Sequence, residues 1–258
     1  MEENEFKLRT TELVSPSGHT FVIREQNGED EDTLSNPKDS KNLMNLTKFI
    51  ASIVVSTNFT QTGKLTVEDA LDLPLLDRYF LLMASRIFSI GEEIEFEYTW
   101  DDGKKFNYTD DLNNYVFDYS KRETITQEEL DAKPNAIPFY PEPASLANKV
   151  ITLSSGKVIS YSALTGRSEM FALSLPEEKK TRNAELLGRN LKLQVNGEWE
   201  KVQNFKTFSV KDMTEIRKSV KVYDPTFTGF TELENPVTNE KIQFPIMAAS
   251  TFFFPTEI

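Results

Sequence analysis

Residues 73–108, LPLLDRYFLLMASRIFSIGEEIEFEYTWDDGKKFNY, change from a helical pattern to a strand pattern within one stretch. In its first part, apolar residues recur every three or four positions, which places them on one side of a helix. These residues are Leu76, Tyr79, Phe80, Met83 and Ile87. Gly91 is a typical helix stop, and after it apolar residues alternate with glutamates up to a turn at residues 101–103. The stretch therefore predicts a buried helix followed by a β-hairpin.

The residues before this stretch predict a hairpin, a loop and two helical segments. Residues 6–23 alternate loosely and turn at 15–18, whereas residues 26–41 are rich in charge, Gly, Asn and Pro, which is typical of a solvated loop. Apolar residues then recur at helical spacing from Leu43 to Val54. Thr66-x-x-Asp69 has the spacing of a weak helix cap, which favours one further helical turn.

Residues 118–149 are the predicted connector between two halves of the chain. Thr126-x-x-Glu129 resembles a capping box and favours a short helix over residues 126–133. Prolines then forbid regular structure and favour an extended path. They are Pro134, Pro138, Pro141 and Pro143. We place a domain boundary in this span.

The second half of the chain repeats the pattern of the first half. An offset of 138 residues carries Gly18, in the first hairpin turn, onto Gly156. The same offset sets apolar residues of the next helix on one another: Phe49 on Leu187, Ile53 on Leu191 and Val55 on Leu193. After a loop that is three residues shorter, an offset of 135 sets Asp77 on Asp212. A unit of roughly 110 residues therefore occurs twice.

We predict an α+β fold with two tandem copies of a hairpin–helix–helix–hairpin unit joined by a Pro-rich connector. The expected domains are a first α+β repeat over 1–117, a connector over 118–149 with a short helix and a Pro-rich extended segment, and a second α+β repeat over 150–258 with an aromatic C-terminal tail. The last helix of the second copy is more polar, so the first copy should be better buried. The charged residues of that helix are Lys211, Glu215, Arg217, Lys218 and Lys221.

Composition narrows the classes of function. The chain has 258 residues, of which 38% are hydrophobic, so it can form real cores. Its 41 acidic and 29 basic residues give a net charge of −12, which argues against a nucleic-acid partner. The absence of cysteine excludes disulfides and thiolate catalysis. The sequence predicts neither a secretory signal nor a membrane span, and synthesis in the cytoplasm is the default expectation.

Three titratable features could carry chemistry, and each has a simpler structural interpretation. His19, the single histidine, follows a turn glycine, where we expect an exposed residue without convergent catalytic partners. The acidic run 29–32 could bind a hard cation, but it lacks EF-hand spacing and reads as a solvated charge run. The glutamates of residues 92–97 could include a glycosidase-like acid pair, but on an alternating strand they form an outer face. We predict no enzymatic activity and no cofactor.

The C-terminal tail contains three consecutive aromatic residues, Phe252, Phe253 and Phe254. Successive side chains of an extended segment point in opposite directions, so these three cannot all enter the chain's own core from such a segment. We expect some of them to contact a partner. The alternative is a tail that folds back over the sheet of the second repeat.

The two tryptophans, Trp100 and Trp199, are the next candidate partner contacts. Aromatic side chains dominate interface energetics where they are not already buried. Trp199 follows Asn196-Gly197 in an expected turn, which favours its exposure. Each Trp could instead cap its own domain.

The repeated pattern resembles a family of tailed-phage proteins, the T4-type baseplate hub assembly proteins and their duplicated relatives in contractile-tailed phages. Three segments carry the resemblance and together cover most of both halves. They are LPLLDRYFLLMASRIFSIGEEIEFEYTW, SALTGRSEMFALS with NAELLGRNLKLQVNG, and PTFTGFTELENPVTNEKIQFPIMAASTFFFP. Many relatives place cysteine pairs in the last hairpin turn, where they look able to bind zinc. The matching positions here, 100–103 and 235–239, contain no cysteine, so we predict no metal and turns held by Gly103, Pro236 and Asn239.

The resemblance implies a structural or assembly role in building the hub or wedge of a phage baseplate. Its partners would be other phage tail and baseplate proteins, with several copies in each particle and no nucleic acid, membrane or small-molecule substrate. The chain would be made in the host bacterial cytoplasm and lie in the tail baseplate of the virion. Two alternatives stay open: an assembly chaperone that leaves before maturation, and a non-catalytic regulatory binding module of the host.

Overall fold

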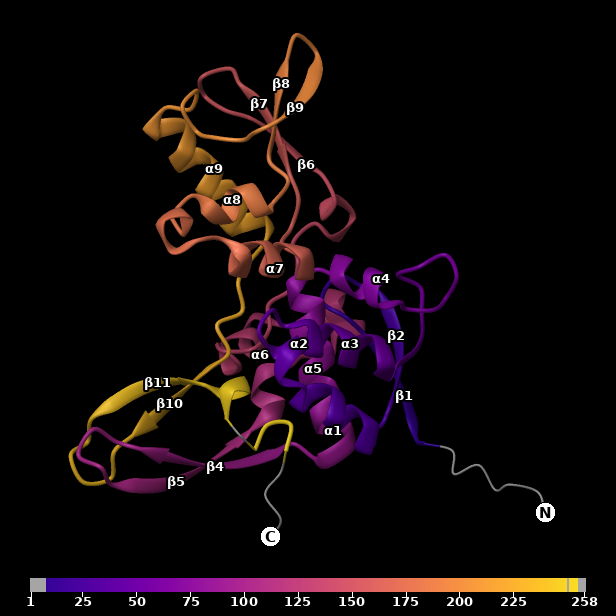
Figure 1. Cartoon of the computed structure of the whole chain (residues 1–258), viewed down its shortest axis with the longest axis vertical. Helices are drawn as coiled ribbons and strands as arrows, with labels where there is room; N and C mark the ends of the chain where they lie inside the picture. The colour runs from indigo at the N-terminus through magenta and orange to yellow at the C-terminus, as the bar shows by residue number, and fades with distance from the viewer. Residues whose placement is uncertain (1–7, 250, 255–258) are drawn as a thin grey trace.

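The computed structural model describes residues 8–249 and 251–254, and it shows a mixed α and β protein with three parts (Figure 1). The first lobe contains residues 8–92, and the second lobe contains residues 149–223. Two β-hairpins, 93–111 and 230–245, lie side by side, extend from the side of the first lobe and are called the arm below. One hairpin of the arm follows the first lobe and the other follows the second lobe. The arm therefore brings together one hairpin from each half of the chain.

The first lobe contains a three-stranded antiparallel sheet packed on helices. Its strands are β1 (Thr10–Val14), β2 (Thr20–Arg24) and β3 (Val54–Thr57), in the order β1-β2-β3. Apolar residues of β2 and of helix α3 (Met44–Ile53) meet in a core that excludes water completely at Phe21, Phe49 and Ile50. The predicted first hairpin and the predicted helix near residues 43–54 are confirmed.

Residues 26–41 form two short helices, α1 (Gly28–Ser35) and α2 (Pro37–Ser40), so the prediction of a solvated loop is wrong. Asn27 and Asn36 cap these helices by accepting backbone N–H bonds. Asp30, within the acidic run, is 2% exposed and accepts hydrogen bonds from Arg24 at 2.7 Å and from Ser52 at 2.7 Å. The polar residues of this segment therefore serve as helix caps and form one buried ion pair, that of Arg24 with Asp30.

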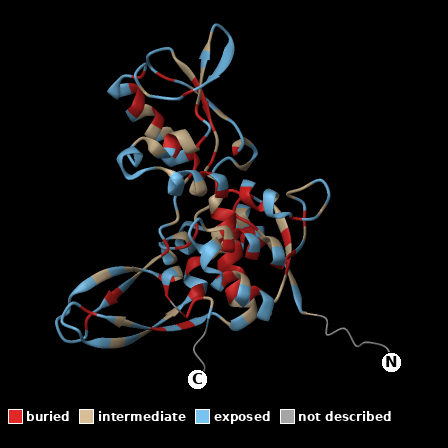
Figure 2. Ribbon diagram, in the orientation of Figure 1, coloured by how far each residue is buried: buried red, intermediate tan, exposed pale blue. Residues whose placement is uncertain are grey.

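Helix α5 (Leu75–Ile90) is the central element of the first lobe, and Figure 2 shows buried residues concentrated along it. Ten of its 16 residues are buried. The shorter helix α4 (Val67–Asp72) precedes it, with the predicted cap formed between Thr66 and Asp69. Gly91 ends α5 with a φ of 122°, a conformation that favours glycine. The predicted buried helix and its stop are confirmed.

The connector packs into the protein core. It contains two 3₁₀ turns, η2 (Tyr119–Thr124) and η3 (Pro143–Ser145), and the capped helix α6 (Gln127–Ala132) near the predicted position. A further 3₁₀ turn, η1 (Leu112–Tyr115), precedes the connector. Tyr140 is fully buried, and its hydroxyl accepts the backbone N–H of Leu76 at 3.2 Å. This bond gives a partner to one of the backbone donors in the first turn of α5, where the connector covers the helix.

The second lobe has a four-stranded antiparallel sheet in the order β6-β7-β8-β9. The strands are β6 (Lys149–Thr152), β7 (Val158–Tyr161), β8 (Lys192–Val195) and β9 (Glu198–Lys201). The helices are α7 (Gly166–Ser174), α8 (Ala184–Gly188) and α9 (Val210–Tyr223), with a 3₁₀ turn η4 (Glu177–Lys179). Only five of the 14 residues of α9 are buried, in agreement with its predicted polarity.

Leu191 and Leu193 lie outside the helix that the repeat pattern predicts for them. Helix α8 ends at Gly188, and Leu193 belongs to strand β8, just as Val55 belongs to β3. Asn190 adopts a left-handed conformation with a φ of 51°, which breaks the helix before these leucines. In both lobes, the matched apolar residues therefore begin in a helix, α3 or α8, and continue into the following strand, β3 or β8.

The arm consists of β4 (Glu93–Thr99) with β5 (Lys105–Asp111), and β10 (Phe230–Glu234) with β11 (Lys241–Pro245). The rings of Phe96 and Phe244 stack between the two hairpins, with centroids 5.0 Å apart and an interplanar angle of 13°. Tyr108 also joins them by donating to the carbonyl of Glu234 at 3.1 Å. A two-stranded hairpin is marginally stable alone, so each hairpin supports the other.

Candidate interaction surfaces

The aromatic tail packs mainly on the first half of the chain. Phe252 is fully buried in a cluster that contains residues of α5 and β4, and Phe253 meets Phe49 edge-on with ring centroids 6.0 Å apart. The hydroxyl of Thr251 donates to the carbonyl of Glu95 at 2.6 Å. Phe254 is 40% exposed. Residues 251–253 form a turn, so the alternation expected of an extended segment does not apply. The tail packs on the first lobe as well as on the β10–β11 hairpin, and not only on the second half of the chain.

The two tryptophans have opposite environments. Trp100 is 4% exposed within the arm, and its indole N–H donates to the hydroxyl of Tyr108 at 2.8 Å. Trp199 is 41% exposed on β9, next to a turn in which Asn196 and Gly197 both have positive φ. The expected exposure of Trp199 is confirmed. Of the five predicted contact residues, Phe254 and Trp199 present the most accessible surface.

The hairpin turns of the arm are closed by their own hydrogen bonds. Gly103 donates to the carbonyl of Trp100 at 2.8 Å, and Asn239 donates to the carbonyl of Asn235 at 2.9 Å. Gly103 and Asn239 have φ angles of 79° and 57°, as turn residues of these types can. Among the described residues, no group of three or more His, Cys, Asp or Glu side chains is arranged to hold a metal ion.

His19 is half-buried, so the prediction of an exposed residue is wrong. Its Nδ1 lies 2.7 Å from the Ser17 hydroxyl oxygen, and its ring packs edge-on against Phe59. The Ser17 hydroxyl and backbone N–H both donate to Asp77, the backbone bond measuring 3.0 Å. A Ser-His-Asp triad needs the carboxylate on the histidine. Here the carboxylate contacts the serine, so the arrangement ties a hairpin turn to α5.

Asp77 and Asp212 occupy corresponding places but have different electrostatics. Complete burial raises the pKa of Asp77 to about 6, against the opposing effect of the bonds from Ser17. Asp212, in the first turn of α9, instead accepts from the ammonium of Lys157 at 2.7 Å, which lowers its pKa. In both lobes, an acid in the first turn of the long helix therefore holds the turn of a hairpin.

A buried ionic contact joins the two lobes. Arg78 of α5 is 3% exposed, donates to the carbonyl of Ala70 at 2.7 Å, and lies 3.5 Å from the carboxylate of Glu169 on α7. Burial raises the pKa of Glu169, while the charge of Arg78 opposes this shift. A Cβ on Gly166 would lie 2.8 Å from the guanidinium, so this glycine allows the close approach. No sequence pattern indicated this pair, because Arg78 and Glu169 are far apart along the chain.

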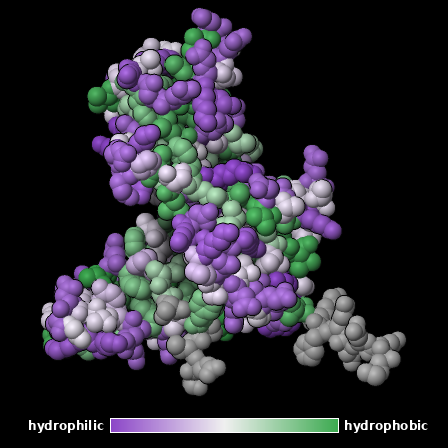
Figure 3. Space-filling model, in the orientation of Figure 1, coloured by the Kyte–Doolittle hydropathy of each residue, from purple (hydrophilic) through white to green (hydrophobic). Residues whose placement is uncertain are grey.

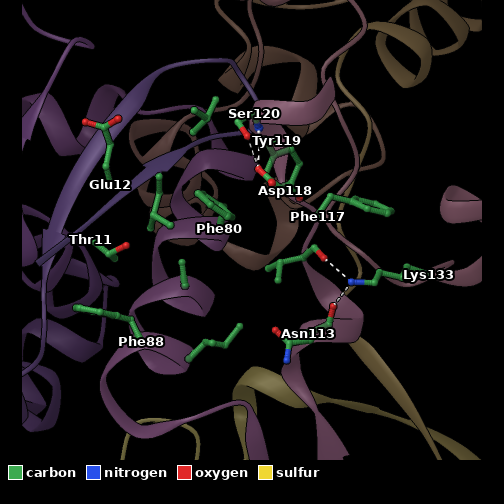
Figure 4. A pocket seen from close by; sticks show the side chains of 15 residues that line it. Thr11, Glu12, Phe80, Phe88, Asn113, Phe117, Asp118, Tyr119, Ser120 and Lys133 are labelled. Atoms are coloured by element: carbon green, nitrogen blue, oxygen red, sulfur yellow. Dashed lines mark hydrogen bonds between the residues drawn. The ribbon is translucent and has the colours of Figure 1, made fainter. Parts of the chain in front are cut away.

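An apolar groove of about 600 Å³ runs beside strand β1. Figure 4 shows Phe80 and Phe88 of α5, Thr11 of β1 and Phe117, just before the connector, around this space. Lys133 lines the far side, where its ammonium donates to the carbonyls of Asn113 at 2.7 Å and Val116 at 3.0 Å. The groove is open to solvent and no sequence pattern predicted it, because its walls come from three separate segments.

Comparisons of the chain with protein-family models, curated proteins and solved structures found no match. None of the helices in the described part of the chain is long and apolar enough to cross a membrane.

Proposed function

We propose that the chain is a non-catalytic structural or assembly protein of a contractile phage tail, which builds the baseplate hub or wedge through contacts with other tail proteins. The family resemblance of the sequence motivates this role. The supporting observation from the structure is the distribution of exposed large apolar side chains. In the first lobe they are Val55, Val67 and Ile90, whereas from residue 149 onward they are Val150, Phe171, Leu173, Trp199, Val210, Val222, Val237 and Phe254.

These residues give the second half the surface expected of a docking element. Val210 is 82% exposed and Val222 is 70% exposed on α9, whose other exposed residues are polar. Figure 3 shows apolar patches that interrupt the hydrophilic surface of the second lobe. Burying such side chains against a partner stabilises a complex by roughly 25 cal/mol per Å² of apolar area, before the costs of association.

We also propose that the two halves are tandem copies of one structural unit. Strands β3 and β8 begin 138 residues apart, at Val54 and Lys192, and helices α5 and α9 begin 135 residues apart, at Leu75 and Val210. The turn contacts of Asp77 and Asp212 support the same correspondence. The paired hairpins of the arm are then the last elements of each copy, placed face to face.

Mass spectrometry of purified virions separates the two proposed forms of this role. A resident baseplate component appears in mature virions at a fixed ratio to other baseplate proteins. An assembly chaperone is present in tail precursors and depleted from mature virions. Absence from both preparations would reject the phage-tail role and favour a regulatory binding module of the host.

A further inference from the structure

Strand β1 lies at the edge of its sheet, and one side of its backbone has no strand partner in the described structure. The backbone bonds from Glu25 to Arg9 and from Ser15 to His19 fix which residues face β2. Because bonding direction alternates along an antiparallel pair, Thr11 and Leu13 also face β2. The N–H and carbonyl groups of Thr10, Glu12 and Val14 therefore point away from β2, and among the described residues they form no main-chain hydrogen bond, although η2 lies close to this strand. An open edge of this kind is a template for an added strand.

The groove described above lies along this edge and would receive alternate side chains of an added strand. Thr11 and Leu13 are partly buried toward the α5 side of the sheet, whereas Glu12 is exposed on the other side. A residue opposite Thr11 or Leu13 would thus face the apolar side chains of α5, which include Phe80 and Ala84. A residue opposite Glu12 would face solvent beside its carboxylate.

Charge identifies the kind of strand that fits. Glu12 forms no ion pair within the described residues, whereas Asp118 and Lys133, the other charged residues of the groove, both have partners. Asp118 pairs with Lys121 at 3.0 Å, and Lys133 is bound to two carbonyls. Pairing of β1 with β1 of a second copy, centred on Glu12, would place two glutamates opposite each other, which is destabilising.

We infer that the β1 edge and its groove bind an extended segment of another protein in which apolar residues alternate with lysine or arginine. The apolar residues enter the groove, a basic residue pairs with Glu12, and the backbone extends the β1-β2-β3 sheet. This inference stands independently of the phage-tail role, because it concerns the chemistry of the ligand segment alone.

The test uses three fluorescein-labelled peptides and the full-length chain, with binding followed by fluorescence anisotropy. The first peptide is TVKVKVT, the second is TVEVEVT, and the third is TVKVKVT with both lysine backbone nitrogens methylated. Methylation removes the donors that face β1 in an antiparallel pairing while keeping the charge. We expect saturable binding of the first peptide with a Kd below about 1 mM, and at least about ten-fold weaker binding of the other two.

Two protein variants complete the test. Glu12→Lys should weaken binding of TVKVKVT by about 3- to 10-fold and strengthen binding of TVEVEVT, because it reverses the sign of one cross-strand pair. Glu200→Lys makes the same charge change on the exposed edge strand β9 and should leave both affinities unchanged. Failure of TVKVKVT to bind, equal binding of the methylated peptide, or equal effects of the two variants would each overturn the inference.

Discussion

Asp77 shows how one buried carboxyl can govern the pH dependence of stability. Its folded-state pKa of about 6 lies above the ordinary value of 3.8. At a pH between these two values, Asp77 keeps its proton in the folded chain and has lost it in the unfolded chain. Stability should therefore fall as the pH rises from about 4 to about 6, by up to about 3 kcal/mol, and change little through this group at higher pH. Asp77→Asn should flatten this part of the profile.

Denaturant unfolding across this pH range measures the effect, with Asp101→Asn as the control. Asp101 is an exposed residue in the turn of the arm, so its replacement should leave the slope as it is in the parent chain. The same slope in the parent and in Asp77→Asn would contradict the assignment of the proton to Asp77.

Gly166 provides a second prediction for a single residue. Gly166→Ala should lower the free energy of unfolding by about 1–3 kcal/mol, because the new methyl group would lie 2.8 Å from the buried Arg78 guanidinium. Gly188→Ala, in the same lobe, places its methyl group no closer than 3.5 Å to any neighbour and should cost less. Thermal or denaturant unfolding compares the two. A larger loss at Gly188 would contradict the packing of α7 on α5.

At the scale of elements, local patterns predicted much of the secondary structure. The spacing in residues 73–108 identified α5 and the β4–β5 hairpin, and caps at Thr66 and Thr126 identified two short helices. These signals succeed because helix faces, caps and turns depend on residues a few positions apart. The sequence did not predict helices α1 and α2, because their residues are mostly polar and show no apolar period. Their few buried contacts are polar ones, such as that of Asp30 with Arg24.

The C-terminal tail gives a prediction for one element. Phe252→Ala should lower the free energy of unfolding by about 3–5 kcal/mol, because the ring is fully buried between the arm and the first lobe. Phe254→Ala, two residues away and 40% exposed, should change it by less than about 0.5 kcal/mol. Denaturant unfolding of both variants makes the comparison. Equal effects would show that the tail does not pack as described.

At the scale of the whole molecule, the arrangement depends on contacts between residues far apart in the sequence. Phe96 with Phe244, and Arg78 with Glu169, join the first half to the second, and no local period encodes such pairs. For the same reason the sequence could not show that Trp100 and Phe252 are buried, while the turn beside Trp199 correctly indicated exposure. Of the predicted contact residues, Trp100 and Phe252 are therefore buried structural residues, whereas Trp199 and Phe254 are accessible at the surface.

The exposed residues of α9 give a prediction for assembly. Val210→Ser combined with Val222→Ser should reduce co-purification with tail proteins, because it removes two of the most exposed apolar side chains of the second lobe. The unfolding free energy should change by less than about 0.5 kcal/mol per site. Val55→Ser, at a 50% exposed site of the first lobe, is the matched control. Equal recovery of tail proteins with all variants would remove α9 from the proposed interface.

The most direct test of the proposed role is sedimentation of tail-assembly intermediates from infected cells, with the chain detected in each fraction. An assembly protein that acts through stable contacts should sediment with the baseplate or its sub-assemblies, and the doubly substituted α9 variant should shift toward the fractions of free protein. If the unsubstituted chain is found only in the fractions of free protein, at every stage of infection, a role in building the baseplate is contradicted.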